Sequence, residues 1–149
     1  MKKTILLLLI VILTACSAST GTDLDRNRQT WQDAGATHYS FDLFIGCFCA
    51  FRDQMPLTIE IQDDEVVSMT YVDGTLVEAS DPGYELFNKY ATITRIFSEL
   101  ETGLTGEADE VTVTYDSTYS FPAEIYFDFI KEAADDELSI QVSNFQIIK

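Results

Sequence analysis

Two cysteines separated by one residue, Cys47 and Cys49, are the side chains in this chain best suited to chemistry. The alternation of the strand predicted at residues 39–45 continues through both cysteines, and residues two apart on a strand point to the same face. Ideal strand geometry places their Cα atoms about 6.6 Å apart, near the upper limit of the range that a disulfide spans. A disulfide therefore requires the chain to bend, and it would fix a local kink rather than stabilise the whole domain. We expect a structural disulfide here.

Other roles for this pair remain open. Redox-active pairs usually have the Cys-x-x-Cys spacing, which differs from the spacing here. Two free thiols or a metal-binding pair are further alternatives, although zinc needs more ligands and His38 is the only histidine. We expect His38 to form a hydrogen bond where a helix joins a strand. A Cys-His nucleophilic pair would require a free cysteine within hydrogen-bonding reach of it.

A group of carboxylates near the C-terminus is the second candidate site. It comprises Asp128, Asp135, Asp136 and Glu137, with Asp116 further upstream. Strand ends and turns can bring such residues together, and calcium prefers oxygen ligands. The residues do not follow the Asp-x-Asp-x-Asp-Gly pattern of a calcium loop, so solvated acidic turns are the alternative.

Motifs of common enzyme classes do not occur in the sequence. They include the hydrolase elbow Gly-x-Ser-x-Gly, a phosphate-binding glycine loop and His-Glu-x-x-His. We predict neither enzymatic activity nor a cofactor.

The N-terminus has the pattern of an export signal. Two lysines precede an unbroken apolar segment at residues 5–13, which is too short for a permanent membrane span of about 20 residues. The following Leu-Thr-Ala-Cys, ending at Cys16, resembles a bacterial lipobox, whose cysteine receives diacylglycerol and becomes the mature N-terminus. We therefore predict a signal peptide at residues 1–15 and lipidation of Cys16. An ordinary secreted protein with a coincidental cysteine is the alternative.

Location and charge limit the partners. Export puts the domain in an oxidising compartment, and Ser17 resembles the residue that permits transport to the outer membrane, so we expect the periplasmic side of the outer membrane rather than the inner membrane. Removal of the signal leaves 7 Lys and Arg against 25 Asp and Glu, a formal charge of −18. Such a surface is repelled by nucleic acid and by anionic lipid head groups. The predicted partners are the membrane, through acylated Cys16, and an envelope protein.

Periodicity predicts the elements that must position these residues. Residues 16–22 are small and polar and predict a flexible tether, followed by one domain at residues 23–149. Helical spacing predicts helices at residues 23–34 and 92–102, the second with Thr92 as N-cap and an open start as early as Leu86. Residues 74–90 predict a surface loop. Alternating apolar residues predict strands at residues 39–45, 57–61, 67–71, 111–115, 123–129 and 138–142.

The apolar parity changes after Val142, which predicts a bulge near Ser143 or Asn144. The order of one helix and three strands occurs twice, and an Asp-Asp-Glu turn falls at a comparable place in each half, residues 63–65 and 135–137, which suggests an old duplication. Short connections and alternation predict an α+β fold: an antiparallel sheet of about six strands with two helices packed on one face.

Several of these motifs together resemble domain-of-unknown-function family 6174. They include Trp31, Cys47-Phe48-Cys49, Phe121-Pro122 and Asp135-Asp136-Glu137, and the resemblance covers about residues 26–146. Members of this family look like bacterial secreted or lipid-anchored single domains. Ser120 departs from the pattern, which has glycine before the aromatic-Pro pair. The resemblance implies location and domain organisation, and implies no activity.

These observations predict a lipid-anchored lipoprotein of the bacterial cell envelope whose domain binds or scaffolds a partner without catalysis. One alternative is a small-ligand or calcium-binding domain at Asp128, Asp135, Asp136 and Glu137. A second alternative is a thiol redox role for Cys47 and Cys49.

Overall fold

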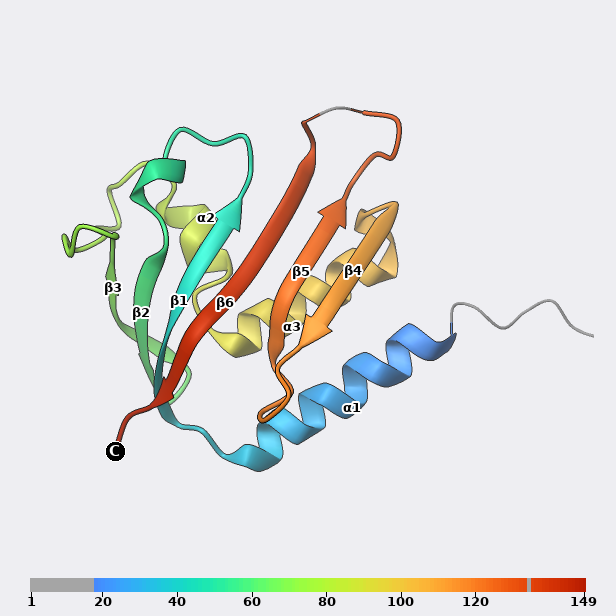
Figure 1. Ribbon diagram of the computed structural model, residues 1–149, viewed down its shortest axis with the longest axis horizontal. Coiled ribbons are helices and arrows are strands. Elements are labelled where there is room, and N and C mark those ends of the chain that lie inside the picture. Colours follow the sequence, from blue (N-terminus) through green and yellow to red (C-terminus); the bar gives the residue numbers. More distant parts are fainter. Residues whose placement is uncertain (1–17, 134) are drawn as a thin grey trace, which may run out of the picture.

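The computed structural model describes residues 18–133 and 135–149 and shows a six-stranded sheet with helices behind it (Figure 1). The predicted signal peptide and Cys16 lie outside the described residues. The elements are α1 (Ala18–Ala34), β1 (His38–Gly46), β2 (Leu57–Gln62), β3 (Glu65–Thr70), α2 (Tyr84–Lys89), α3 (Ile93–Thr102), β4 (Glu110–Tyr115), β5 (Pro122–Asp128) and β6 (Glu137–Ile147). A 3-10 turn at Arg52–Gln54 and a π turn at Gly103–Glu107 lie between them. None of the helices in the described ranges is long and apolar enough to cross a membrane.

The strands are antiparallel and lie in the order β3-β2-β1-β6-β5-β4, which confirms the predicted α+β fold. The two central strands are the first strand after α1 and the last strand of the chain. The order within the first half, β3-β2-β1, is the same as within the second half, β6-β5-β4. Equivalent strands run in opposite directions, because β1 and β6 are antiparallel neighbours. The suggested duplication stays a prediction.

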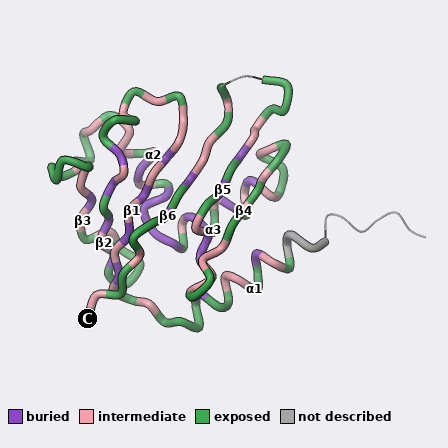
Figure 2. Tube along the Cα trace, viewed as in Figure 1, coloured by how far each residue is buried: buried purple, intermediate pink, exposed green. Residues whose placement is uncertain are grey.

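One face of the sheet forms the core with the helices. Buried and half-buried residues alternate along β1 (Figure 2), and the buried ones are Tyr39, Phe41, Leu43 and Ile45. Across from them, α3 contributes its buried residues, which are Ile93, Ile96, Phe97 and Leu100. None of the helices in the described ranges covers the opposite face of the sheet, which we refer to as the open face (Figure 1).

Two local predictions are confirmed. Thr92 caps α3, because its Oγ1 accepts a hydrogen bond from the backbone N–H of Arg95 at 3.2 Å. The bulge in β6 is present: the pairing with β1 shifts by one residue and Asn144 has φ +52°. The extra residue returns Phe145 to the helix-covered face, where its ring lies 5.7 Å from that of Trp31.

Two predictions need correction. α1 already includes residues 18–22, which were predicted as part of the flexible tether. Thr22 and Asp23 resemble an N-cap, but Ser, Thr and Asp also occur inside helices at modest cost, so this signal does not fix a helix start. Residues 74–90 are not one loop, because α2 forms within them and buries Phe87 completely. Tyr90 and Thr92 then separate α2 from α3, so the chain forms two helices rather than one extended helix.

Candidate binding site

Two connections meet at one end of the sheet, drawn at the top of Figure 1. Residues 46–56 join β1 to β2, and residues 128–137 join β5 to β6. We refer to these two segments as the loop end. Since β1 and β5 both run antiparallel to β6, which lies between them, their C-terminal ends point to the same side of the molecule. The fold thus brings together the predicted cysteine pair and the predicted carboxylates.

The first connection is held in place on both sides of the cysteine pair. Phe51 packs edge-on against buried Phe87 of α2, with ring centroids 4.8 Å apart. The backbone N–H of Ile45 faces the Sδ of Met55 at 3.1 Å, and the N–H of Val72 donates to the carbonyl of Gln54 at 3.0 Å. The loop is therefore fixed by contacts with the core rather than free in solvent.

The chain bends immediately after β1 and brings the sulfur atoms of Cys47 and Cys49 into bonding contact, with Cα atoms 5.3 Å apart. This separation is shorter than that of ideal strand geometry, as the predicted kink requires. Phe48, between the two cysteines, is 92% exposed. Most apolar side chains of this size are buried, so a nearly fully exposed phenylalanine on a fixed loop is a marked exception.

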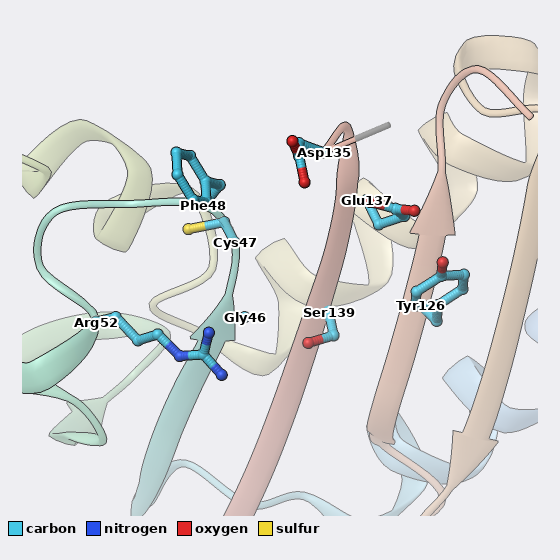
Figure 3. Close-up of a pocket in the computed structure, with 8 residues that line it drawn as sticks. All are labelled: Gly46, Cys47, Phe48, Arg52, Tyr126, Asp135, Glu137 and Ser139. Carbon is cyan, nitrogen blue, oxygen red and sulfur yellow. The ribbon is translucent and has the colours of Figure 1, made fainter. Parts of the chain in front are cut away.

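A cavity of about 320 Å³ lies beside Phe48, on the open face (Figure 3). Its lining residues are Gly46, Cys47, Phe48, Arg52, Tyr126, Asp135, Glu137 and Ser139. Gly46 leaves the floor open, because a Cβ at this position would overlap the Oγ of Ser139 on β6. Figure 3 shows Phe48 and Arg52 on one side, and Glu137 pointing toward Tyr126 on the other. The cavity therefore offers two aromatic rings, a guanidinium and two carboxylates to one ligand.

The side of the cavity formed by β5 and β6 is strongly acidic. Asp128 and Glu137 are direct cross-strand partners. Partial burial, followed by the nearby carboxylates of Asp136 and Glu137, raises the pKa of Asp128 above its usual value. Partial burial and the same acidic surroundings, Glu137 first among them, raise the pKa of Tyr126. These shifts indicate negative charge that nearby cations do not neutralise.

The cations near these carboxylates are few. Lys131 lies 3.7 Å from Glu110 at the start of β4, in an exposed pair of small energetic value. Arg52 makes no ion pair with any residue that the structure describes. Both carboxylate oxygens of Asp136 are enclosed and accept no hydrogen bond from the described part of the chain.

The predicted calcium ligands are only partly brought together. Asp128 and Glu137 are neighbours and Asp135 lines the cavity, but within residues 18–133 and 135–149 no three Asp, Glu, His or Cys side chains form a group that could hold a metal ion. Asp116 lies at the opposite end of the sheet, where its Oδ1 accepts hydrogen bonds from the backbone of Thr118 and Tyr119. The calcium site stays a prediction.

His38 lies at the other end of β1 from the cysteines. Its Nε2 forms a hydrogen bond with Oε1 of Glu60 at 2.8 Å, which confirms the predicted structural role. A strand of nine residues separates His38 from Cys47 by roughly 30 Å. The two residues therefore do not form a nucleophilic pair.

Sequence reasoning missed several residues of the cavity, namely Gly46, Arg52, Tyr126 and Ser139. Nothing in their own sequence context marks them, because register between distant strands brings them together. Phe48 did carry a signal, since an apolar residue between two bridged cysteines cannot turn inward as easily as one in a regular strand.

The comparisons with known proteins give a family and no activity. A family model described as a family of unknown function, DUF6174, matches residues 23–147, which is most of the chain. No curated protein and no solved structure matches the chain. The matched region contains every described element of the sheet and the whole loop end. The chain therefore belongs to the DUF6174 family.

Proposed function

We propose that this protein is a lipid-anchored lipoprotein of the bacterial cell envelope, attached through Cys16, whose loop end binds a basic partner protein without catalysis. The observation that carries this proposal is the 92% exposure of Phe48 on a loop that core contacts and the cysteine pair hold in place. The periplasmic side of the outer membrane is the proposed location, as expected from Ser17.

An exposed aromatic side chain of this kind suits protein recognition. Interfaces concentrate their binding energy in a few aromatic or arginine anchors that fill pockets on the partner. A loop that is already ordered loses little conformational entropy when it binds. Phe51, packed on Phe87, and Met55, facing Ile45, supply this order on the C-terminal side of Phe48.

The charge around Phe48 indicates the kind of partner. Asp135 and Glu137 line the cavity, and partial burial, followed by the repulsion of nearby carboxylates, raises the pKa of Asp128. Lysine or arginine side chains of a partner would relieve this repulsion and speed association. We therefore propose a partner surface with an apolar pocket for Phe48 and basic residues around it.

A photo-reactive amino acid at position 48 tests this binding in intact cells. The matched control places it at position 76, because Leu76 is also an exposed apolar residue, 60% exposed, and lies outside the loop end. We expect position 48 to capture one envelope protein that position 76 does not capture. The adduct should disappear when Asp135→Asn and Glu137→Gln are combined. Equal capture from both positions, no capture at position 48, or an adduct that survives the double substitution would contradict the proposal.

Anchoring has a separate test. Cys16→Ala, expressed behind a secretion signal that is cleaved without lipidation, should move the protein from the membrane fraction to the soluble envelope fraction. Ser17→Ala behind the original signal is the control and should stay with the membranes. If the Cys16 variant stayed with the membranes as well, lipid would not be the anchor.

Cation binding by the same carboxylates is a second candidate function, favoured by the carboxylate oxygens of Asp136, which are enclosed and accept no hydrogen bond from the residues that the structure describes. A calcium ion could satisfy such oxygens. Calcium at millimolar concentration should then raise the melting temperature, and Asp136→Ala should abolish the rise. An unchanged melting temperature in the unsubstituted protein would eliminate this candidate.

A further inference from the structure

The two edges of the sheet differ in whether another segment of the chain pairs with them. After β3 the chain turns back, and its return segment pairs with the strand: Leu76 bridges Thr70, and the N–H of Val77 donates to the carbonyl of Met69 at 2.9 Å. β4, at the other edge, pairs with β5 on one side. In the described ranges no strand or bridge lies on its outer side, and Figure 1 shows it at the margin of the sheet.

The sequence of β4 is well suited to pairing and poorly protected against it. It alternates valine and threonine and ends in tyrosine, all residues with high strand propensity. Proteins usually guard a free edge with lysine, proline or a covering element, and β4 contains neither residue. Val111, Val113 and Tyr115 pack against the core but remain half-buried, and no strand in the described ranges lies beyond them.

The charges around β4 are acidic. Glu110 begins the strand and lies opposite Asp128 of β5, and Thr114 lies opposite Glu124. A second copy of this chain would bring another acidic edge and a formal charge of −16 or more negative against the first. A basic segment would instead place its Lys or Arg side chains beside these carboxylates.

We propose that the free edge of β4 accepts an extended, basic segment of a partner protein as a seventh strand of the sheet. Its alternate apolar residues would cover Val111 and Val113, and its basic residues would lie on the open face beside Thr112 and Thr114. Backbone hydrogen bonds supply affinity in this mode of recognition, and the alternating side chains supply specificity.

This inference goes beyond the proposed function, because it concerns a different surface and does not depend on Phe48. Three strand spacings, about 14 Å in all, separate β4 from β1, so one partner can touch both surfaces or only one.

The test uses the processed protein with Cys16→Ala and a synthetic peptide of alternating lysine and valine, followed by amide hydrogen exchange measured by NMR. We expect the peptide to protect alternate amides of residues 110–115 and to leave those of residues 65–70 unchanged. A peptide of alternating glutamate and valine, and a lysine-valine peptide with a central proline, should give no protection.

Matched variants sharpen the test. Thr112→Lys places a positive charge on the edge strand. It should lower the affinity for the lysine-valine peptide by about tenfold, because like charges would meet on the open face. Gln146→Lys adds the same charge at an exposed position of β6 and should change the affinity by about twofold or less. Phe48→Ala, which removes the anchor of the proposed function, should leave the protection of β4 intact.

Several results would overturn the inference. Protection at residues 65–70 instead of 110–115, or protection by the acidic peptide, would show that β4 is not the basic-strand site. Protection that Thr112→Lys leaves unchanged would do the same. If residues 110–115 were already protected without peptide, in proportion to protein concentration, a second copy of the chain would be the occupant and the proposed partner would be wrong.

Discussion

The two ends of the sheet both carry an Asp-Asp-Glu sequence, yet they are built for different tasks. At the end opposite the loop end, which we refer to as the turn end, Asp63 and Asp64 have φ +54° and +65° and join β2 directly to β3. The N–H of Asp63 donates to the carbonyl of Thr37 at 2.7 Å. At the loop end, Asp135 lines a cavity, and both carboxylate oxygens of Asp136 are enclosed without a hydrogen-bond partner among the described residues.

The difference shows that the same three residues can form a tight turn in one place and part of a candidate binding site in another. Aspartate tolerates the left-handed region, so the first pair makes a tight hairpin and stays solvated. The second pair follows a longer connection and leads into Glu137, the cross-strand partner of Asp128, so that Asp136 and Glu137 concentrate negative charge beside Asp128. The surroundings brought by neighbouring strands, rather than the residues themselves, decide the role.

The largest expected effect is on the aromatic cluster of the turn end. Trp31 is 7% exposed and makes edge-to-face contacts with Tyr39, Phe121 and Phe145. Trp31→Ala should lower the free energy of unfolding by about 3–5 kcal/mol, because it leaves a cavity and removes these contacts. Urea denaturation measures the loss.

Phe48→Ala is the matched aromatic truncation at the loop end. Because Phe48 is 92% exposed, the free energy of unfolding should change by about 0.5 kcal/mol or less. Comparable losses at positions 31 and 48 would mean that Phe48 serves the fold rather than binding.

A smaller effect is expected at Ser120 in the turn end. Ser120 has φ +61°, a left-handed conformation that costs energy for any residue with a Cβ. Ser120→Gly should therefore raise the free energy of unfolding by about 0.5–1 kcal/mol. Ser68→Gly, inside β3, is the control and should change it in the opposite direction. A destabilised Ser120→Gly protein would show that the serine side chain contributes more than the strain costs.

The smallest effect is expected at Asp128 in the loop end. Its pKa is raised in the folded protein, so the folded state holds this proton more tightly than the unfolded chain does. Asp128 therefore destabilises the fold above its raised pKa, and the penalty disappears as the pH falls through that pKa. Asp128→Asn should raise the melting temperature at neutral pH, and the difference should vanish in acid.

Asp63→Asn provides the comparison at the turn end. This residue is exposed in a hairpin, and the same substitution should change the melting temperature less than Asp128→Asn does at neutral pH. Equal changes at the two positions, or a pH-independent gain at Asp128, would remove the electrostatic distinction between the two ends.

Much of the fold followed from local patterns. Alternation on β1 and β2, the cap at Thr92 and the parity change near Asn144 each reflect a nearby physical cause, and each was confirmed. α2 was not predicted, because six residues carry too little periodicity and Phe87 becomes informative only when Phe51 and Tyr71 pack on it. The cavity was not predicted because it depends on the register of β6 between β1 and β5, which places Ser139 opposite both Gly46 and Tyr126.

The most direct test of the proposed binding role is the affinity of the processed protein for the envelope protein captured at position 48, measured for Phe48→Ala and Leu76→Ala. Both substitutions remove an exposed apolar side chain, but only the first removes one from the loop end. If Phe48 is a binding anchor, Phe48→Ala should lower the affinity for the captured protein by at least about tenfold, while Leu76→Ala should change it by about twofold or less. Equal affinities for the two variants would contradict the assignment of binding to the loop end.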